Sequence, residues 1–380
     1  MEIDKIRELP IYKNKEGKYL LKKDIVTNFP ENFGITITDD YEYATTSGTT
    51  SDRMEIIRTP NWWKDEYVRT YSNNPKLKEY LDKGLHKVIF TTAQCSNLIC
   101  FVDKPPMEKR TIGNTLYVNN TFNPWSWTKE DIKTIIGEIN LFKPFYLDAD
   151  PIYLSVFLYL KDKYKIKTKI HNPSIITLSY EFVTESSKKY IQQYFKNAEI
   201  LNLYGTTEFG YIFLEKNGKM NLCKDLVNID LLEIDCEKQL YTLIIDSYKN
   251  KYMPLLDYRV GDMVIATKEQ VLTFKEKGIV EKMAGREKDL LEGNISYSML
   301  DEVIHKISQN ILFYQFYLIS DNIYILKYIT KNGEVINELE QSQIVRDIEN
   351  LGLKIKLNFK LVEEIAPEMS GKFTILKRNI

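Results

Sequence analysis

Four short segments of this chain carry residues whose types and spacing could perform chemistry. In chain order they are residues 46–50 (Thr-Ser-Gly-Thr-Thr), 204–208 (Tyr-Gly-Thr-Thr-Glu), 258–262 (Tyr-Arg-Val-Gly-Asp) with 285–289 (Gly-Arg-Glu-Lys-Asp), and 370–372 (Ser-Gly-Lys). Together they offer a loop that can hold phosphates, a metal-facing carboxylate, a ribose-facing carboxylate, a basic residue beside a hinge and a late lysine. These are the groups needed to join ATP to a carboxylic acid as an acyl-adenylate.

The first segment is rich in small and hydroxyl side chains. Gly48 lets the backbone approach an anion, and the hydroxyl and amide groups around it can point into one concavity. Such a loop suits a triphosphate. Taken alone, however, the segment is also typical of an ordinary polar turn.

Glu208 and Asp262 are candidate ligands for a metal ion and for a ribose. Glu208 comes just after a predicted strand at 200–203, and ligands of open α/β sheets bind at the carboxyl ends of strands, so this carboxylate could bind Mg²⁺. Asp262 follows Gly261, and a carboxylate at a tight turn can accept both ribose hydroxyls. The alternatives are a solvated glutamate at a strand end and a plain Gly-Asp hairpin turn.

Two basic residues could bind phosphate charge. Arg286 follows Gly285 at a predicted domain break, where its guanidinium could reach ribose or phosphate. Lys372 could bring an ammonium to the α-phosphate and the carboxylate, where negative charge develops in the transition state. The alternatives are a surface arginine in a linker and a solvated lysine near the C-terminus.

The composition is that of an ordinary globular protein and favours neither nucleic acid nor membrane as a partner. The 380 residues carry a formal net charge of -1, so no overall field attracts either kind of partner. The first residues lack the basic and apolar regions of a signal peptide, and the apolar run Ile152–Leu160 is too short to span a membrane. We therefore expect a cytoplasmic protein.

The scarce histidines and scattered cysteines exclude several kinds of site. The histidines, His86, His171 and His305, are isolated in the sequence, which argues against a histidine metal cluster or a Ser-His-Asp triad. No two cysteines have CxxC spacing and their neighbours are apolar, so we expect buried free thiols. The cysteines are Cys95, Cys100, Cys223 and Cys236.

Strand-like and helix-like stretches alternate through the first three quarters of the chain, which predicts a mainly parallel, helix-covered sheet. Thr128 and Asp131 form a capping pattern that opens one helix, and apolar residues then recur at helical spacing. The predicted strands are 87–92, 144–147, 174–182 and 199–204, and the further predicted helices are 152–163 and 186–197.

The pattern changes twice towards the C-terminus. Short strands with turns between 231 and 263 indicate an antiparallel region, and a break follows near 285–293. The last part predicts a compact α+β domain. Its predicted helices are 298–308 and 341–350, and its predicted strands are 312–319, 322–329 and 354–361.

The order and context of the segments resemble the adenylate-forming (AMP-binding) superfamily, which includes acyl-CoA synthetases and the adenylation domains of peptide synthetases. Within it the chain is most similar to the phenylacetate-CoA ligase group, because residues 178–185 (Leu-Ser-Tyr-Glu-Phe-Val-Thr-Glu) lead through a helix into 203–210 (Leu-Tyr-Gly-Thr-Thr-Glu-Phe-Gly). The resemblance implies an α/β fold. Its large N-terminal domain, residues 1–285, has mostly parallel helix-covered sheets, binds ATP and the acid, and is abbreviated at its N-terminus. The resemblance also implies a small α+β C-terminal domain, residues 286–380, that rotates about Asp289.

The resemblance also implies a role for each matched residue. Glu208 and Lys372 are the expected catalytic residues, with Glu208 holding Mg²⁺ and Asp289 acting as the hinge. The expected ATP- and AMP-binding residues are Thr46, Ser47, Gly48, Thr49, Thr50, Ser179, Tyr180, Glu181, Tyr204, Gly205, Thr206, Thr207, Asp262 and Arg286. Residues with polar or aromatic side chains could line the acid pocket, although they are equally typical of a core; they are Thr92, Gln94, Phe122, Trp125 and Trp127.

The implied reaction uses ATP and Mg²⁺ to activate a carboxylic acid, with an aryl or short apolar acid favoured by the aromatic content. Pyrophosphate leaves, and the acyl group passes to the thiol of CoA or of a carrier protein's phosphopantetheine. The chain departs from the family pattern at Ser51, where Gly is usual, at Val260, where Thr or Ser is usual, and at Glu292, where Lys is common. Ser51 and Glu292 leave open a catalytically degenerate nucleotide- or acyl-binding module. A ligase of the same fold with an amine or protein-thiol acceptor also stays open.

Overall fold

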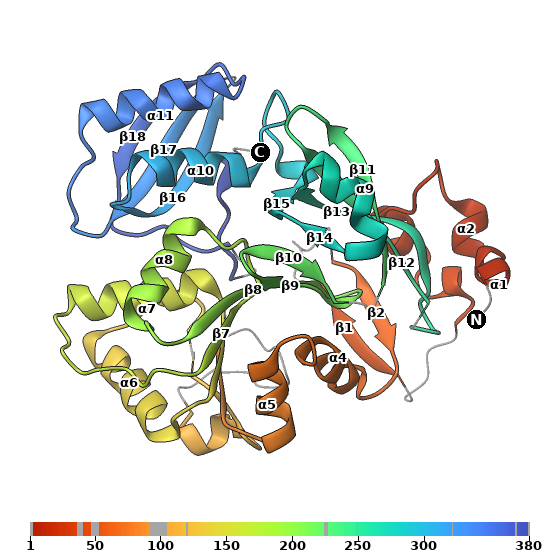
Figure 1. Ribbon diagram of the computed structural model, residues 1–380, viewed down its shortest axis with the longest axis horizontal. Coiled ribbons are helices and arrows are strands. Elements are labelled where there is room, and N and C mark those ends of the chain that lie inside the picture. Colours follow the sequence, from red (N-terminus) through yellow and green to blue (C-terminus); the bar gives the residue numbers. More distant parts are fainter. Residues whose placement is uncertain are drawn as a thin grey trace. The chain divides into compact units, whose positions relative to one another are not determined.

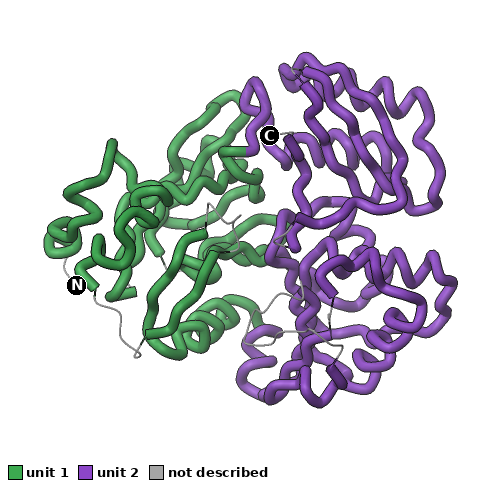
Figure 2. Tube along the Cα trace, turned by 180° about the vertical axis from the view of Figure 1, so that it is seen from behind, with its two compact units in different colours: residues 1–75, 203–288 green, residues 76–202, 289–380 purple. Residues whose placement is uncertain are grey.

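The computed structural model describes residues 3–35, 41–46, 53–91, 105–118, 121–223, 227–248, 250–320, 322–368 and 371–378. These residues divide into two compact units, each made from two separate stretches of chain (Figure 2). Unit 1 consists of Met1–Pro75 and Leu203–Lys288, and unit 2 consists of Lys76–Asn202 and Asp289–Ile380. The expected domains, 1–285 and 286–380, stay a prediction.

A parallel sheet forms the centre of unit 2. Its strands lie in the order β8-β7-β6-β3-β5, with every neighbouring pair parallel, and β4 adds to β5 in the antiparallel sense. Strands β7 and β8 lie side by side in Figure 1. Strand β8 begins in unit 2 and ends in unit 1. The bounds are β3 (Lys87–Phe90), β4 (Thr111–Ile112), β5 (Thr115–Tyr117), β6 (Tyr146–Ala149), β7 (Ile175–Leu178) and β8 (Glu199–Thr206).

Three helices cover this sheet, and each begins at a polar residue that caps it. Thr128 accepts the amide hydrogen of Asp131 and the Asp131 carboxylate accepts that of Thr128, so the predicted capping box is confirmed. Asp150 accepts two amide hydrogens of its helix, and Thr184 accepts one. The helices are α6 (Lys129–Phe142), α7 (Pro151–Lys163) and α8 (Glu185–Tyr194).

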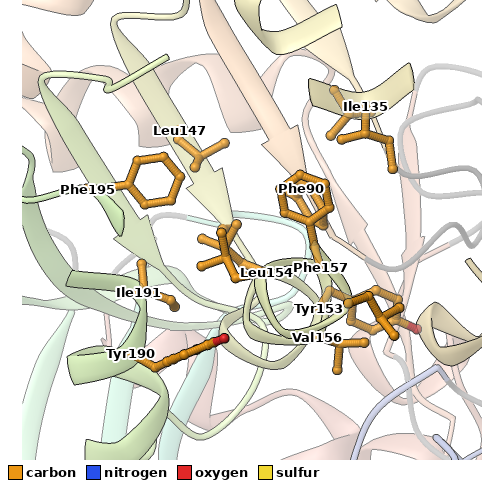
Figure 3. Packing of buried hydrophobic residues seen from close by; sticks show 14 of the residues in the cluster. Phe90, Ile135, Leu147, Tyr153, Leu154, Val156, Phe157, Tyr190, Ile191 and Phe195 are labelled. Atoms are coloured by element: carbon orange, nitrogen blue, oxygen red, sulfur yellow. The ribbon is translucent and has the colours of Figure 1, made fainter. Parts of the chain in front are cut away.

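The core of unit 2 lies between the parallel strands and these helices (Figure 3). Helix α7 is apolar nearly all round, so it is buried along most of its length. Phe157 on this helix is fully buried, and its ring centroid lies 5.1 Å from that of Phe90 on β3. This packing holds α7 against the sheet.

The C-terminal part of unit 2 is the small α+β structure that the sequence predicts. Its strands lie in the order β18-β17-β16-β19, with β16 and β17 antiparallel and the outer pairs parallel. The strands are β16 (Ile311–Ser320), β17 (Ile323–Thr330), β18 (Lys356–Leu361) and β19 (Leu376–Arg378), and the helices are α10 (Tyr297–Ile307) and α11 (Glu338–Asn350).

Unit 1 is built mainly of antiparallel strands. One sheet has the order β11-β12-β13-β15, β1 pairs with β2, and the end of β8 pairs with β9, which continues to β10 and β14. The strands are β1 (Glu42–Thr45), β2 (Glu55–Arg58), β9 (Gly210–Lys216), β10 (Lys219–Leu222), β11 (Asn228–Asp235), β12 (Leu240–Ser247), β13 (Leu255–Ile265), β14 (Ile279–Val280) and β15 (Lys282–Arg286).

Short helices complete the two units. Those of the first 30 residues pack apolar side chains such as Ile6 and Ile25 against the sheet of β12 and β13. The helices are α1 (Ile3–Arg7), α2 (Pro10–Asn14), α3 (Lys22–Val26), α4 (Trp62–Tyr71), α5 (Pro75–Lys83) and α9 (Lys268–Lys277), with 3-10 turns η1 (Glu31–Phe33), η3 (Met107–Arg110), η4 (Pro124–Ser126) and η5 (Glu287–Asp289).

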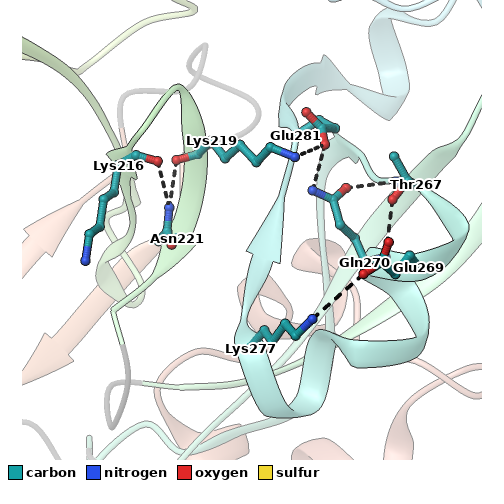
Figure 4. Close-up of polar contacts among 8 residues, drawn as sticks. All are labelled: Lys216, Lys219, Asn221, Thr267, Glu269, Gln270, Lys277 and Glu281. Atoms are coloured by element: carbon teal, nitrogen blue, oxygen red, sulfur yellow. Dashed lines mark hydrogen bonds and ion pairs between the residues drawn. The ribbon is translucent and has the colours of Figure 1, made fainter.

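Helix α9 is held mainly by polar contacts (Figure 4). Thr267 and Gln270 form a capping box, and the Gln270 amide also donates to Glu281, 2.8 Å away. Glu281 in turn accepts from Lys219 on β10 at 2.7 Å. Because α9 buries little apolar surface, its sequence lacks the helical apolar period, and the sequence analysis did not predict it.

The predicted mixed α/β fold is confirmed, with small differences. Helix α11 begins at Glu338 rather than 341, because Asn337 and Glu340 form a capping box there. The prediction of a buried Cys236 is wrong: this thiol is exposed, because it lies in the turn after β11, whereas Cys223 is buried as expected. Cys95 and Cys100 lie outside the described residues. Of the helices in the described ranges, none is both long and apolar enough to cross a bilayer.

We predict that Phe157→Ala lowers the free energy of unfolding by about 3–5 kcal/mol, because it leaves a cavity in the packed core of unit 2. Leu141→Ala is the matched control, since Leu141 on α6 is 74% exposed and its truncation should change stability by less than about 0.5 kcal/mol. Urea denaturation measures both. Equal losses in the two variants would contradict this description of the core.

Candidate functional site

Three residues that are distant in the sequence meet at the Asp262 carboxylate in unit 1. The Tyr204 hydroxyl donates to Oδ2 of Asp262 at 2.7 Å, and Nε of Arg286 lies 3.5 Å from Oδ1. Asp262 and Arg286 are also direct partners in the pairing of β13 with β15. A carboxylate has about four lone-pair sites, so Asp262 can still accept hydroxyl groups of a ligand.

The backbone of β13 explains why the Asp262 side chain reaches this position. The pairing of β13 with β12 shifts register between Thr242 and Ile244, and Gly261 at this irregularity has φ +82°. A bulge of this kind turns a strand and redirects its side chains, and glycine adopts the left-handed backbone without strain. Asp262 therefore lies within a bulged strand, and the alternative of a plain Gly-Asp hairpin turn is wrong.

Glu208 follows the end of β8, as the sequence predicts. The Tyr258 hydroxyl lies 3.4 Å from its Oε1. Burial raises the pKa of the Glu208 carboxyl above its usual value and Asp262 adds to the rise, while hydrogen bonds within 206–208 and the charge of Lys22 oppose it. Burial and the neighbouring Glu208 likewise raise the pKa of Tyr258. A carboxylate surrounded by these groups favours a cationic partner.

Gly205 is required by the close approach of two backbones. It pairs with Tyr211 of β9, and a Cβ atom at position 205 would lie 2.5 Å from the carbonyl oxygen of Gly210. Thr206 accepts the amide hydrogen of Phe209 at 3.2 Å, which closes the turn that carries Glu208. The carbonyl of Thr207 accepts from the buried Arg58, 3.4 Å away.

Thr46 lies at one end of the predicted phosphate loop. Its amide donates to the Met54 carbonyl and its hydroxyl accepts the Met54 amide, both at 2.9 Å, so these two residues fix the ends of the loop. Lys22 donates to the Thr46 hydroxyl at 3.4 Å. The remaining predicted loop residues, Ser47, Gly48, Thr49 and Thr50, lie outside the described residues.

Ser179 and Tyr180 are anchored in unit 2 by a buried carboxylate. Both hydroxyls donate to Asp148 at 3.3 Å, and Asp148 also pairs with the Lys87 ammonium at 2.8 Å. Tyr180 has φ +77°, a backbone strain that a non-glycine residue tolerates only when its surroundings fix it. The two hydrogen bonds supply that constraint, and they also position Glu181.

Lys372 is near enough to Asp150, the buried carboxylate that caps α7, for its charge to act on that carboxylate. Burial raises the pKa of Asp150 to about 7, although two backbone amides and the Lys372 ammonium all lower it. Gly371, before the lysine, and Phe373, after it, each bond to the part of unit 2 before residue 203. The sequence alone gave no sign that the charge of this lysine acts on Asp150.

The residues predicted for the acid pocket have different surroundings. Phe122 is 40% exposed, Trp127 is buried in the core, and Trp125 donates from its indole nitrogen to the Ile365 carbonyl at 2.8 Å. Thr92 and Gln94 lie outside the described residues. The roles of these residues, like those of the nucleotide-binding residues, stay predictions.

Several supporting residues were missed by the sequence analysis. Lys22 beside Thr46, and the Lys87–Asp148 pair below Ser179, belong to no recognisable motif. Glu287, one residue after Arg286, accepts two hydrogen bonds from Arg259, with nitrogen–oxygen distances of 3.0 and 2.6 Å. These contacts join residues far apart in the sequence, so no local pattern signals them.

Comparison with known proteins identifies the fold. No family model matches the chain. The protein CapK of Staphylococcus aureus is 24% identical over 267 residues, which cover 66% of this chain and 56% of CapK. The match therefore extends over little more than half the length of that relative.

Solved structures of CoA ligases share the fold over most of this chain. A 2-hydroxyisobutyryl-CoA ligase in its postadenylation state, in complex with 2-HIB-AMP, has a TM-score of 0.67 and 11% identity, covering 96% of this chain and 80% of that one. A benzoate CoA ligase from Burkholderia xenovorans has a TM-score of 0.56 and 14% identity, and the match covers 89% of this chain and 68% of that one. An anthranilate CoA ligase in complex with anthranoyl-AMP has a TM-score of 0.54 and 14% identity, and the match covers 88% of this chain and 65% of that one.

The raised pKa of Asp150 predicts a pH-dependent stability. Between about pH 4 and pH 7 the folded protein keeps a proton on Asp150 that the unfolded chain releases, so the stability falls as the pH rises through this range. Asp150→Asn resembles the protonated form and can still cap α7. We expect the free energy of unfolding of this variant to exceed that of the wild type by an amount that grows from pH 4 to pH 7 and reaches about 1–4 kcal/mol. Urea denaturation across this range measures it, and a constant difference would contradict the prediction.

Proposed function

We propose that this protein activates a carboxylic acid with ATP, forms an acyl-adenylate with release of pyrophosphate, and transfers the acyl group to a thiol. The observation that carries the proposal is the meeting of Tyr204, Asp262 and Arg286, which come from three separate motifs. A carboxylate held by a hydroxyl and a guanidinium is suited to bind the two ribose hydroxyls of a nucleotide. The fold shared with CoA ligases supports the same reaction.

In the first step, a carboxylate oxygen of the acid attacks the α-phosphorus of ATP. The bond between the α-phosphorus and the bridging oxygen to the β-phosphate breaks, and pyrophosphate leaves with its electron pair. We propose that Asp262 and Arg286 hold the ribose, Ser179, Tyr180, Glu181 and Tyr204 flank the adenine, and the loop 46–50 with Thr206 and Thr207 holds phosphates. Lys372 stabilises the charge that develops at the α-phosphate and the carboxylate.

We propose that Glu208 is the protein ligand for Mg²⁺. Among the described residues no cluster of three or more candidate metal ligands exists. A single carboxylate nevertheless fits Mg²⁺, which is commonly bound by one or two carboxylates together with substrate phosphates and water. The ion would neutralise phosphate charge when bound. Burial and the nearby Asp262, which raise the pKa of Glu208, also favour a cation beside it.

In the second step, a thiolate attacks the acyl carbonyl carbon and AMP leaves with the electron pair of the broken carbon–oxygen bond. We propose CoA or the phosphopantetheine of a carrier protein as the thiol, and an enzyme of the phenylacetate-CoA ligase type. The similar structures contain acyl-adenylates of a short hydroxy acid and of an aryl acid. The second ligand supports an aryl acid, and the first a short acid, as the substrate class; the aromatic content of the chain favours an aryl or short apolar acid. We propose that residues 286–380 rotate about Asp289 between the two steps.

We predict that Lys372→Ala lowers the rate of acid-dependent pyrophosphate release by about 10²–10³-fold, because it removes the charge that stabilises the transition state. The KM for ATP should change little, since other groups hold the nucleotide. A coupled pyrophosphate assay with hydroxylamine, which traps the activated acyl group as a hydroxamate, measures the effect.

The matched control is Lys377→Ala, a nearby and partly exposed lysine that pairs with Glu368 at 3.1 Å. Because surface pairs contribute little, this variant should keep its rate within about twofold. An equal loss in both variants, or full activity of Lys372→Ala, would contradict the proposed role of Lys372.

A further inference from the structure

The segment that carries Lys372 is held on both sides of the lysine. On one side, the carbonyl of Gly371 lies 2.9 Å from the Tyr153 hydroxyl, which donates to it. On the other side, the amide of Phe373 donates to Oε1 of Glu181, also at 2.9 Å. Both contacts use backbone atoms of the segment, so they fix the path of the chain at the lysine whatever the lysine side chain does.

Tyr153 is well placed to hold this segment because its own position is fixed. It lies in the first turn of α7 and is fully buried. Its ring packs edge-on against Trp127 at 6.4 Å and against Phe373 at 5.7 Å between centroids. The hydroxyl also lies 2.6 Å from the Phe122 carbonyl, and since it has one proton it donates to one of the two carbonyls at a time.

Glu181 is fixed by the residues before it. Ser179 and Tyr180 both bond to Asp148, and Asp148 is in turn paired with Lys87 at the start of β3. This buried network holds the strained backbone at Tyr180 and so directs the Glu181 carboxylate to the Phe373 amide. A charged acceptor makes a stronger hydrogen bond to an amide than a neutral one does.

Further contacts hold the segment before and after the hydrogen bonds of Gly371 and Phe373. Before Lys372, the Ile365 carbonyl accepts from the indole of Trp125 at 2.8 Å. After it, the Thr374 carbonyl accepts from Gln315 at 2.9 Å and the Ile375 carbonyl accepts from the Phe316 amide at 2.7 Å. The contacts at 374 and 375 join the segment to β16, within the small α+β structure, whereas Tyr153 and Glu181 join it to the parallel-sheet part of unit 2.

We propose that Tyr153 and Glu181 are positioning residues that hold Lys372 in place for adenylation and are dispensable for the transfer to the thiol. The inference rests on the proposed function, because it assigns Lys372 to the first step. Neither residue touches a reacting atom in this account. They act by fixing the backbone on both sides of the lysine. Because Glu181 is also proposed to flank the adenine, the loss of the Tyr153 hydroxyl is the change that should slow the step that uses Lys372 and leave the other step unchanged.

Hydrogen exchange tests the contacts without any need for activity. Amide exchange in peptides that cover residues 371–378 is measured by mass spectrometry for the wild type, Tyr153→Phe, Glu181→Ala and Glu181→Gln. We expect about tenfold faster exchange in Tyr153→Phe and Glu181→Ala, the effect of one lost hydrogen bond. Glu181→Gln keeps an acceptor oxygen, so it should stay close to the wild type.

Tyr164→Phe is the matched control for exchange, because the Tyr164 hydroxyl also donates to a backbone carbonyl, that of Trp127, at 2.8 Å. It should leave the exchange of 371–378 unchanged. The proposal would be overturned if residues 371–378 exchanged at the wild-type rate in Tyr153→Phe and Glu181→Ala. It would also be overturned if they exchanged as fast in Tyr164→Phe as in those two variants.

The two half-reactions test the role in catalysis. We expect Tyr153→Phe to lower the rate of acid-dependent pyrophosphate release about tenfold with an unchanged KM for ATP, and to form thioester from synthetic acyl-adenylate and CoA at the wild-type rate. Equal losses in both half-reactions, or none, would overturn the positioning role. If the wild type itself releases no pyrophosphate with any acid, the proposed function fails, and the exchange experiment alone decides whether the two contacts hold the segment.

Discussion

The site in unit 1 depends on a single carboxylate, that of Asp262. A hydroxyl from β8 and a guanidinium from β15 both reach it, so one side chain joins three motifs that are widely separated in the sequence. Their meeting requires the bulge at Gly261 and the close approach of backbones at Gly205. The glycines of these motifs therefore have structural roles: Gly261 permits the bulge next to Asp262, and Gly205 permits the close approach of β8 and β9.

Unit 2 contains buried charge that its packing alone would not require. Asp148 and Lys87 form an ion pair in which both side chains are almost fully buried. Charges removed from water destabilise a protein unless they are paired and hydrogen-bonded, and even a good pair contributes little to stability. The hydroxyls of Thr177, Ser179 and Tyr180 supply the hydrogen bonds for Asp148. We infer that the role of this network is to position the segment around Glu181.

The sequence predicted elements well where local signals are strong. The capping box at Thr128 and the apolar run of α7 both gave the right helices, and the strand-helix alternation gave the parallel sheet. It failed where an element depends on distant partners, as for α9, whose Gln270 bonds to Glu281, a residue outside the helix that in turn accepts from Lys219. The motif residues were found because their types are distinctive, whereas Lys22 and Asp150 were missed because only the folded chain brings them to Thr46 and Lys372.

The most direct test of the account is exchange of labelled pyrophosphate into ATP by the wild-type protein, with a panel of aryl, short-chain and amino acids. This exchange reports reversible formation of an acyl-adenylate and needs no thiol acceptor. The account predicts exchange that depends on Mg²⁺ and on one class of acid, with aryl or short apolar acids the most active. ATP binding without exchange for any acid of the panel would contradict the central claim and favour a nucleotide-binding module.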